Sequence, residues 1–267
     1  MGRIEETLKR TRAEGRLALV AFITAGYPEP EATPGLVRAL VEGGADLVEL
    51  GIPFSDPLAD GATIQRASFR ALEVGMTPAR CLDIVREVRG REKGVPLILM
   101  GYCNPLLAMG LRPFVEGAAA AGVDGLIVVD LPPEEGAELA SLCRSHGVDS
   151  ILLLAPSSDE ARIAAVAKQA SGFIYCVSVA GVTGARRDLP SDLGAFLGRV
   201  RRHTSLPLAV GFGVSRREHV ESLAGLADAA VVGSAIIDVI DAAPREEREE
   251  RVRQYLQTLR GPDGARP

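Results

Sequence analysis

Two carboxylates in one short, proline-containing stretch are the residues best suited to chemistry in this sequence. Glu49 interrupts the mostly apolar run Ala45–Leu50, and Asp60 follows within the stretch Glu49–Gln65, ELGIPFSDPLADGATIQ. A carboxylate at the end of a buried strand loses hydration, so its pKa rises toward the range that suits proton transfer. We therefore interpret Glu49 as an acid–base group. The alternative is that the strand ends one residue early and Glu49 points into solvent.

Asp60 and Asp56 also have ordinary structural explanations. An Asp shortly before the helix-like stretch Ala62–Val74 is a common N-cap, and Asp56, between Ser55 and Pro57, is typical of a turn. Alone, neither residue would indicate a catalytic site.

The elements that must position these carboxylates alternate along the chain. Short aliphatic runs predict eight strands, at Leu17–Thr24, Ala45–Leu50, Leu97–Gly101, Gly125–Val129, Ser150–Leu154, Phe173–Val177, Leu208–Gly211 and Ala229–Val232. Stretches with helical spacing lie between them, at Glu31–Glu42, Pro78–Arg89, Pro113–Ala121, Glu134–His146, Asp159–Ala170, Leu193–Arg202 and Arg216–Ala224. This alternation requires parallel strands with helical crossovers, and eight units in 267 residues favour an α/β fold consisting of a single (β/α)₈ TIM barrel.

Further helices are expected around this barrel. Gly2–Gly15 predicts an N-terminal helix across one end, Ala62–Leu72 an extra helix in the second loop, and Pro244–Leu259 a closing helix that stops at Gly261. We expect residues 1–260 to form one domain and residues 261–267 a flexible tail.

Two glycine-containing turns follow the last two predicted strands. Barrels commonly bind phosphate there, through backbone N–H groups and the N-terminus of a short helix. Gly213 lies in the first turn, beside Phe212, and Gly233 and Ser234 lie in the second. Ordinary tight turns are the alternative. The long connection Ser178–Pro190 predicts a lid, against the alternative of a disordered surface loop.

Two other kinds of catalytic site, a Schiff-base lysine and a metal centre, lack suitably placed residues in this sequence. None of Lys9, Lys93 and Lys168 ends a predicted strand, so no Schiff-base lysine is expected. The three histidines fall in or near helices on separate crossovers, so we expect no metal site. Tyr175 shares a strand face with Phe173 and Val177. If this face points inward, the Tyr175 hydroxyl needs a partner, and Glu49 would be one.

The segment ELGIPFSDPLADG closely resembles the signature of the tryptophan synthase alpha chain family. Four further blocks resemble that family in the same order along the chain: FITAGYP at 22–28, VDLPPEE at 129–135, YCVSVAGVTGAR at 175–186 and GFGVS at 211–215. The resemblance implies a carbon–carbon lyase that cleaves indole-3-glycerol phosphate into indole and glyceraldehyde 3-phosphate in tryptophan biosynthesis. It implies that Glu49 moves the proton, that Asp60 accepts a hydrogen bond from the indole N–H, and that Tyr175 orients Glu49 or the substrate.

The resemblance also implies the substrate pocket and the partner. The indole would be held by Phe22, Met100, Ile127, Leu153 and Phe212, and the phosphate by Gly184, Gly213, Gly233 and Ser234, with Thr183 serving lid closure. Pro53, Asp56 and Pro57 would face a beta chain in an α₂β₂ heterotetramer. Pyridoxal phosphate is expected only in that beta chain, and no cofactor in this one. A free-standing lyase, another phosphate-sugar barrel enzyme such as an epimerase, and a mainly regulatory partner-binding barrel remain alternatives.

Composition limits other functions. The net charge of −5 and the lack of a dense basic cluster argue against nucleic-acid binding. No apolar run reaches the roughly 18 residues of a membrane span, and the charged start lacks the core of a signal peptide. The four cysteines are scattered. We therefore expect a soluble cytoplasmic protein with reduced cysteines.

Overall fold

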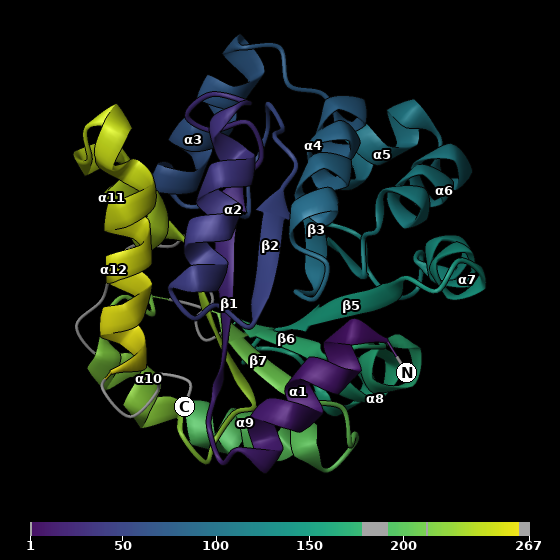
Figure 1. Ribbon diagram of the computed structural model, residues 1–267. Helices are drawn as coiled ribbons and strands as arrows, with labels where there is room; N and C mark the ends of the chain where they lie inside the picture. The colour runs from purple at the N-terminus through teal and green to yellow at the C-terminus, as the bar shows by residue number, and fades with distance from the viewer. Residues whose placement is uncertain (1, 178–191, 212, 262–267) are drawn as a thin grey trace.

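The chain forms a closed eight-stranded parallel barrel in strand order β1 to β8 (Figure 1). The computed structural model describes residues 2–177, 192–211 and 213–261. The strands are β1 Ala18–Thr24, β2 Leu47–Gly51, β3 Leu97–Gly101, β4 Gly125–Val128, β5 Asp149–Leu154, β6 Ile174–Val177, β7 Leu208–Gly211 and β8 Ala229–Val232. The predicted (β/α)₈ barrel is thus confirmed, and every predicted strand is present within two residues at each end.

Helices surround the barrel and cover its outer face. They are α1 Arg3–Ala13, α2 Ala32–Glu42, α3 Ala62–Glu73, α4 Pro78–Arg91, α5 Cys103–Met109, α6 Leu111–Ala121, α7 Ala137–Ser145, α8 Glu160–Gln169, α9 Leu193–Arg201, α10 Arg217–Leu223, α11 Ser234–Ala242 and α12 Arg248–Arg260, with a 3₁₀ turn η1 Arg245–Glu247. None of the helices within the described ranges is both long and apolar enough to cross a membrane.

Three helical segments differ from the sequence prediction. Helix α7 begins at Ala137, three residues after the predicted start at Glu134. Helix α5 is absent from the predicted helices; its Pro105 is tolerated because it lies in the first turn, where its N–H would have no partner in the helix. The closing helix begins later than predicted. Pro244 is extended (ψ 150°) and is followed by a 3₁₀ turn, so the α-helical part starts at Arg248 and ends, as expected, before Gly261.

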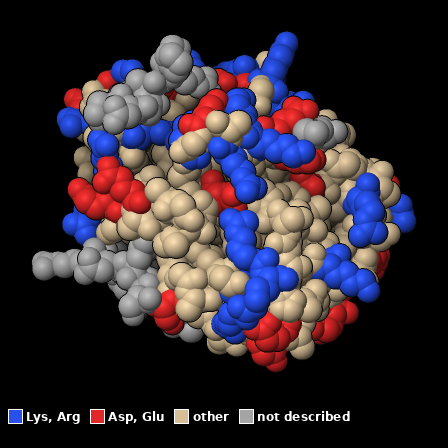
Figure 2. Space-filling view, turned by 90° about the horizontal axis from the view of Figure 1, so that it is seen from below, with Lys and Arg blue, Asp and Glu red and all other residues tan. Residues whose placement is uncertain are grey.

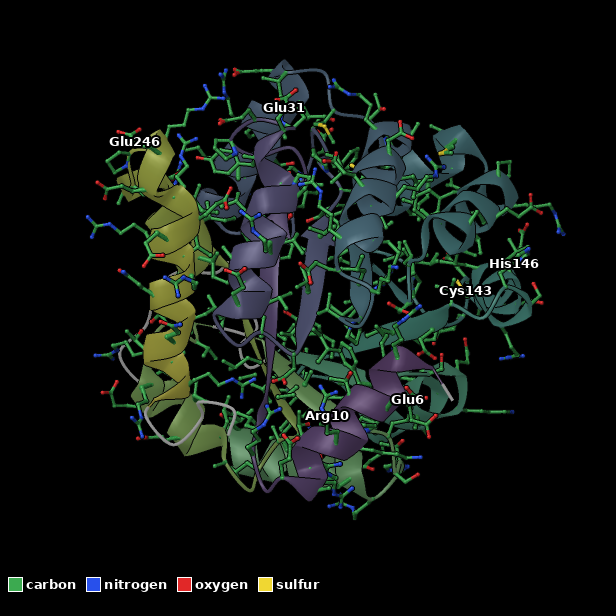
Figure 3. The ribbon with its side chains drawn as sticks, viewed as in Figure 1. Glu6, Arg10, Glu31, Cys143, His146 and Glu246 are labelled. Carbon is green, nitrogen blue, oxygen red and sulfur yellow. The ribbon has the colours of Figure 1, made fainter. Side chains whose placement is uncertain are left out.

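Helix α1 closes the N-terminal end of the barrel. Its Ile4 and Leu8 are buried in the barrel interior, together with Leu47, Ile98 and Phe173. The opposite face of α1 is solvated, and Glu6 and Arg10 project outward from it (Figure 3). The amphipathic stripe in the sequence therefore explains why this helix packs across the barrel bottom.

Positive and negative side chains are mixed on the side of the molecule that is seen from below. Figure 2 shows Lys and Arg side chains interspersed with Asp and Glu on this side of the molecule. Many charged side chains of the protein pair within one helix, as in Lys9–Glu5 on α1 and Arg217–Glu221 on α10. Pairs of this kind contribute little to stability.

Three aspartates at the N-terminal end of the barrel hold neighbouring strands in register. Asp46 donates its N–H to Leu19 O (2.9 Å), and its Oδ2 accepts the Leu19 N–H (2.9 Å). Asp124 makes the same reciprocal pair with Leu97, and Asp228 with Leu208. Each aspartate therefore fixes the start of one strand against the start of the next.

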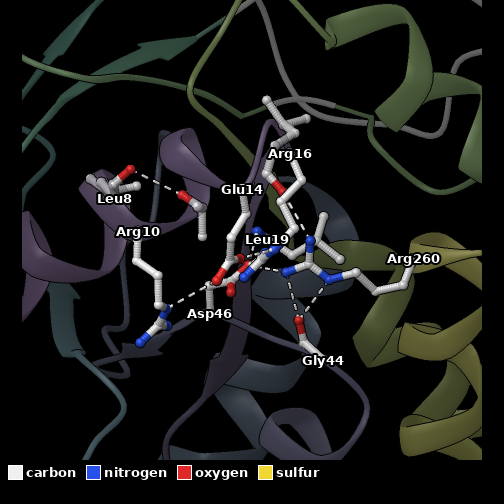
Figure 4. A network of polar contacts seen from close by, with 10 residues as sticks. Leu8, Arg10, Glu14, Arg16, Leu19, Gly44, Asp46 and Arg260 are labelled. Carbon is white, nitrogen blue, oxygen red and sulfur yellow. Dashed lines mark hydrogen bonds and ion pairs between the residues drawn. The ribbon is translucent and has the colours of Figure 1, made fainter. Parts of the chain in front are cut away.

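Arginines complete each of these pairs. Asp46 accepts from Arg16 Nη1 (2.9 Å) and from Arg260, the last residue of α12, which also donates to Gly44 O (Figure 4). Asp124 accepts from Arg3 (2.8 Å) and Arg89 (2.6 Å). A buried carboxylate with several donors is costly to break, because the remaining partners are left uncompensated.

We expect Asp46→Ala to destabilise the fold by about 3 kcal/mol, because two arginines and the Leu19 N–H lose their acceptor. Urea unfolding measures this loss. The control is Asp83→Ala, which removes an exposed pair with Arg86 inside α4 and should cost less than about 1 kcal/mol. Equal losses for the two variants would mean that Asp46 does not fix the register.

Candidate active site

Glu49 lies inside the barrel with no exposed surface. It aligns with Phe22 on β1 and Ile98 on β3, and it shares the inward face of β2 with Leu47. The solvated-strand-end alternative is therefore wrong. Neither carboxyl oxygen of Glu49 has a hydrogen-bond partner among the described residues.

The environment of Glu49 favours its neutral form. Burial, and after it the nearby charge of Asp60, raises the Glu49 pKa to about 8. At neutral pH the side chain is thus a carboxylic acid that faces a cavity and holds a proton that it can donate.

Asp60 does not cap the helix that follows it. Gly61 occupies the N-cap of α3, and no side chain caps that position, so the N-cap interpretation of Asp60 is wrong. Instead, Asp60 Oδ2 accepts a hydrogen bond from Tyr102 Oη (3.1 Å). Burial raises the Asp60 pKa to about 6, and the Tyr102 hydrogen bond opposes this rise.

Tyr102 is a site residue that the sequence analysis missed. It follows β3, is buried, and packs its ring against Phe54 with centroids 5.2 Å apart. Its hydroxyl oxygen accepts the Ala59 N–H (3.0 Å), so its own proton is directed toward Asp60. The available signal was its place directly after the C-terminal end of a predicted strand, where barrel sites gather.

Tyr175 lies on the inward face of β6 and lines the same cavity, as its alternation with Val177 predicted. The hydrogen bond to Glu49 that we expected is absent, since both Glu49 oxygens lack a partner in the part of the chain described. Burial, followed by the charges of Glu49 and Asp60, raises the Tyr175 pKa well above its ordinary value. Gly211 makes room for this ring, because a Cβ there would lie 2.2 Å from the Tyr175 hydroxyl.

The cavity between these residues has a volume of about 190 Å³ and a largely apolar wall. Phe22, Met100 and Leu153 contribute to this wall, as predicted. Ile127 does not, because it lies one layer deeper in the barrel and is fully buried with the interior core. Val129, two residues further along the same inward face, lines the cavity in its place.

The other end of the cavity is suited to an anion. Gly213, Gly233 and Ser234 line it, and α11 begins at Ser234, so the positive end of the α11 dipole lies at the cavity wall. Gly213 has φ 64°, a conformation that favours glycine. Thr183, Gly184, Phe212 and the predicted lid Ser178–Pro190 lie outside the described residues.

In the loop after β2, only one of the three residues expected to face a partner, Asp56, is exposed. Pro53 and Pro57 are buried and brace the loop, whereas Asp56 and the neighbouring Leu58, which is 86% exposed, face outward. Only the outward residues can meet a partner without rearrangement of the loop.

In the part of the chain that the structure describes, metal-ligating residues and lysines do not gather near the cavity. Across the described ranges, no group of three or more His, Cys, Asp or Glu is arranged to hold a metal ion. Lys9 lies on α1, Lys168 on α8, and Lys93 in the connection before β3. Among the described residues, the titratable side chains that line the cavity are Glu49, Asp60, Tyr175 and Asp238.

Comparison with known proteins agrees with this geometry. The family model described as tryptophan synthase alpha chain matches residues 8–262. A tryptophan synthase alpha chain from Roseiflexus castenholzii is 51% identical over 261 residues, covering 98% of this chain and 100% of the relative.

Solved structures agree as well. The crystal structure of tryptophan synthase subunit alpha from Legionella pneumophila has a TM-score of 0.90 at 38% identity and covers 97% of each chain. A chain in the tryptophan synthase complex from Pyrococcus furiosus has a TM-score of 0.84 at 38% identity, covering 91% of this chain and 97% of that one. The chain therefore belongs to the tryptophan synthase alpha chain family.

Proposed function

We propose that the cavity between Glu49, Asp60 and the N-terminus of α11 is where this chain cleaves indole-3-glycerol phosphate into indole and glyceraldehyde 3-phosphate. The observation that carries the proposal is the fully buried carboxyl group of Glu49, which has no hydrogen-bond partner among the described residues and faces a cavity with Asp60 on its wall. A buried acid without a partner is costly, so its retention favours a use in proton transfer.

Glu49 closes a proton cycle in this proposal. As a neutral acid it donates its proton to indole C3, so that the ring departs as a neutral product. The carboxylate that remains then takes the proton of the side-chain hydroxyl as the carbon–carbon bond breaks and the aldehyde forms. The net result moves one proton from oxygen to carbon and returns Glu49 to its starting form, with no metal or organic cofactor required in this chain.

Asp60 supports the same step by electrostatics. Its ionised carboxylate accepts a hydrogen bond from the indole N–H and stabilises the positive charge that develops on the ring after C3 protonation. Tyr102 holds one carboxylate oxygen, which leaves the other for the substrate. Tyr175 would orient the hydroxyl of the glycerol phosphate side chain toward Glu49.

The two ends of the substrate fit the two ends of the cavity. Phe22, Met100, Val129 and Leu153 offer apolar contact to the indole ring. The phosphate would accept hydrogen bonds from backbone N–H groups at Gly213, Gly233 and Ser234, where the dipole of α11 favours negative charge. By family resemblance, Thr183 and Gly184 would complete this end.

A beta chain is the proposed partner, in an α₂β₂ assembly in which its pyridoxal phosphate site receives indole. Asp56 and Leu58 are the exposed residues of the loop beside the catalytic carboxylates, so they would contact it. Turnover measured with and without a cognate beta chain separates this assembly from a free-standing lyase. A purely regulatory barrel would have no need of a buried, unpartnered Glu49.

We expect Glu49→Gln to lower the lyase rate by at least about 10²-fold, because an amide of the same shape can neither give nor take the proton. Binding of glycerol phosphate should persist, since the phosphate end is untouched. Steady-state turnover and calorimetric binding measure the two quantities. Glu73→Gln, an exposed change on α3, is the control. Near-normal turnover of the Glu49 variant would remove Glu49 from the mechanism.

The pH profile of kcat/KM should be bell-shaped, with limbs near pH 6 and pH 8. Activity falls below the lower limb because Asp60 must be ionised, and above the upper limb because Glu49 must be protonated. In Asp60→Asn the acid limb should disappear. The alkaline limb should move to lower pH, because the charge that raises the Glu49 pKa is gone. Activity that rises through pH 8 would contradict the assignment of Glu49 as the acid.

A further inference from the structure

A polar cluster joins the two helices that carry the ends of the active site. Arg66 on α3 contacts two carboxylates of α11, Asp241 Oδ2 at 2.5 Å and Asp238 Oδ1 at 3.7 Å. Thr63, one turn before Arg66, donates to Asp238 Oδ1 (3.3 Å). Tyr27, in the loop after β1, donates to the second oxygen of Asp241. The cluster therefore ties α3, α11 and this loop together.

The position of these helices relative to each other matters to the reaction. Helix α3 begins two residues after Asp60, and α11 begins at Ser234, at the phosphate end of the cavity. Each helix is a rigid unit with a substrate-binding group at its N-terminus. Because Arg66 bridges them about one turn into α3, it fixes the span between the two ends of the substrate.

The same contacts also reduce the negative charge at the phosphate end of the cavity. The Asp238 side chain lines the cavity together with Thr63, and a carboxylate there opposes the binding of an anion. No Lys or Arg lines the cavity within the described ranges. Arg66 offsets Asp238 and Asp241 from just outside that lining, so the dipole of α11 is left to act on the ligand.

Stability is a weak explanation for this cluster. The Arg66 and Asp238 side chains are 53% and 57% exposed, and Asp241 is 27% exposed; ion pairs to an arginine so open to solvent contribute little to folding. A contact that adds little stability but spans both ends of a site is better explained by its effect on that site.

We propose that Arg66 is a positioning residue for the phosphate end of the active site: through Asp238, one turn after Ser234, and Asp241, in the last turn of α11, it holds α11 against α3 and so sets where the N-terminus of α11 lies. The inference rests on the proposed function, because it concerns the binding of the same phosphate. Arg66 does not touch the substrate in this proposal and acts only through the two aspartates.

The test measures the KM for indole-3-glycerol phosphate, kcat, and the Kd of glycerol 3-phosphate for Arg66→Ala and Arg66→Lys. We expect Arg66→Ala to raise KM and Kd about threefold to fivefold and to leave kcat within about twofold, since the lost contact acts on ground state and transition state alike. Arg66→Lys keeps the charge and should restore most of the affinity.

Arg70→Ala is the matched control. Arg70 lies one turn further along α3 and forms an exposed pair with Glu73 of the same helix, without reaching α11. It should leave KM and Kd unchanged. If the unaltered chain binds glycerol 3-phosphate and Arg66→Ala binds it as tightly as Arg70→Ala does, the inference is wrong while the proposed function stands. If the unaltered chain neither binds glycerol 3-phosphate nor cleaves the substrate, both fail.

Discussion

The register of the barrel strands is the constraint on which the active site depends. Successive side chains on a strand point to opposite sides, so a shift of one residue would turn Glu49 outward and bring Val48 or Leu50 into the barrel. The reciprocal hydrogen bonds of Asp46 with Leu19 fix the start of β2 against β1. The carboxylate that carries the chemistry is therefore positioned by a second carboxylate at the opposite end of the barrel.

The cost of placing Glu49 inside the barrel has a definite pH dependence. Its pKa is raised from an ordinary value of 4.5 to about 8, so between these values the folded protein holds a proton that the unfolded chain releases. The unfolded state then binds fewer protons, and this group makes stability fall as pH rises through that window. Below the site, Leu47, Ile98 and Phe173 pack with Ile4 and Leu8 of α1 in the barrel interior. The burial of these apolar side chains offsets the free-energy cost of burying Glu49.

Sequence patterns predicted the parts of the site that follow from strand periodicity. Glu49 and Tyr175 face inward because residues two apart share a strand face, and Gly233 and Ser234 lie at the mouth because they follow the last strand. The family resemblance placed Ile127 in the pocket, but strand periodicity could not rank positions along one inward face, and Val129 lines the cavity instead. Strand periodicity also could not predict hydrogen bonds between segments far apart in the sequence. Tyr102 and Asp60 are 42 residues apart, and Arg66 and Asp241 are 175 residues apart.

The central claim is that Glu49 enters the reaction as a neutral acid, and titration of its carboxyl carbon by NMR tests this most directly. Glutamate labelled with ¹³C at the carboxyl group, with Glu49→Gln used to assign the signal, would report its ionisation in the ligand-free protein. The account predicts a midpoint near pH 8. A midpoint near the ordinary value of 4.5 would mean that Glu49 is already a carboxylate at neutral pH, and would contradict the proton cycle proposed for this site.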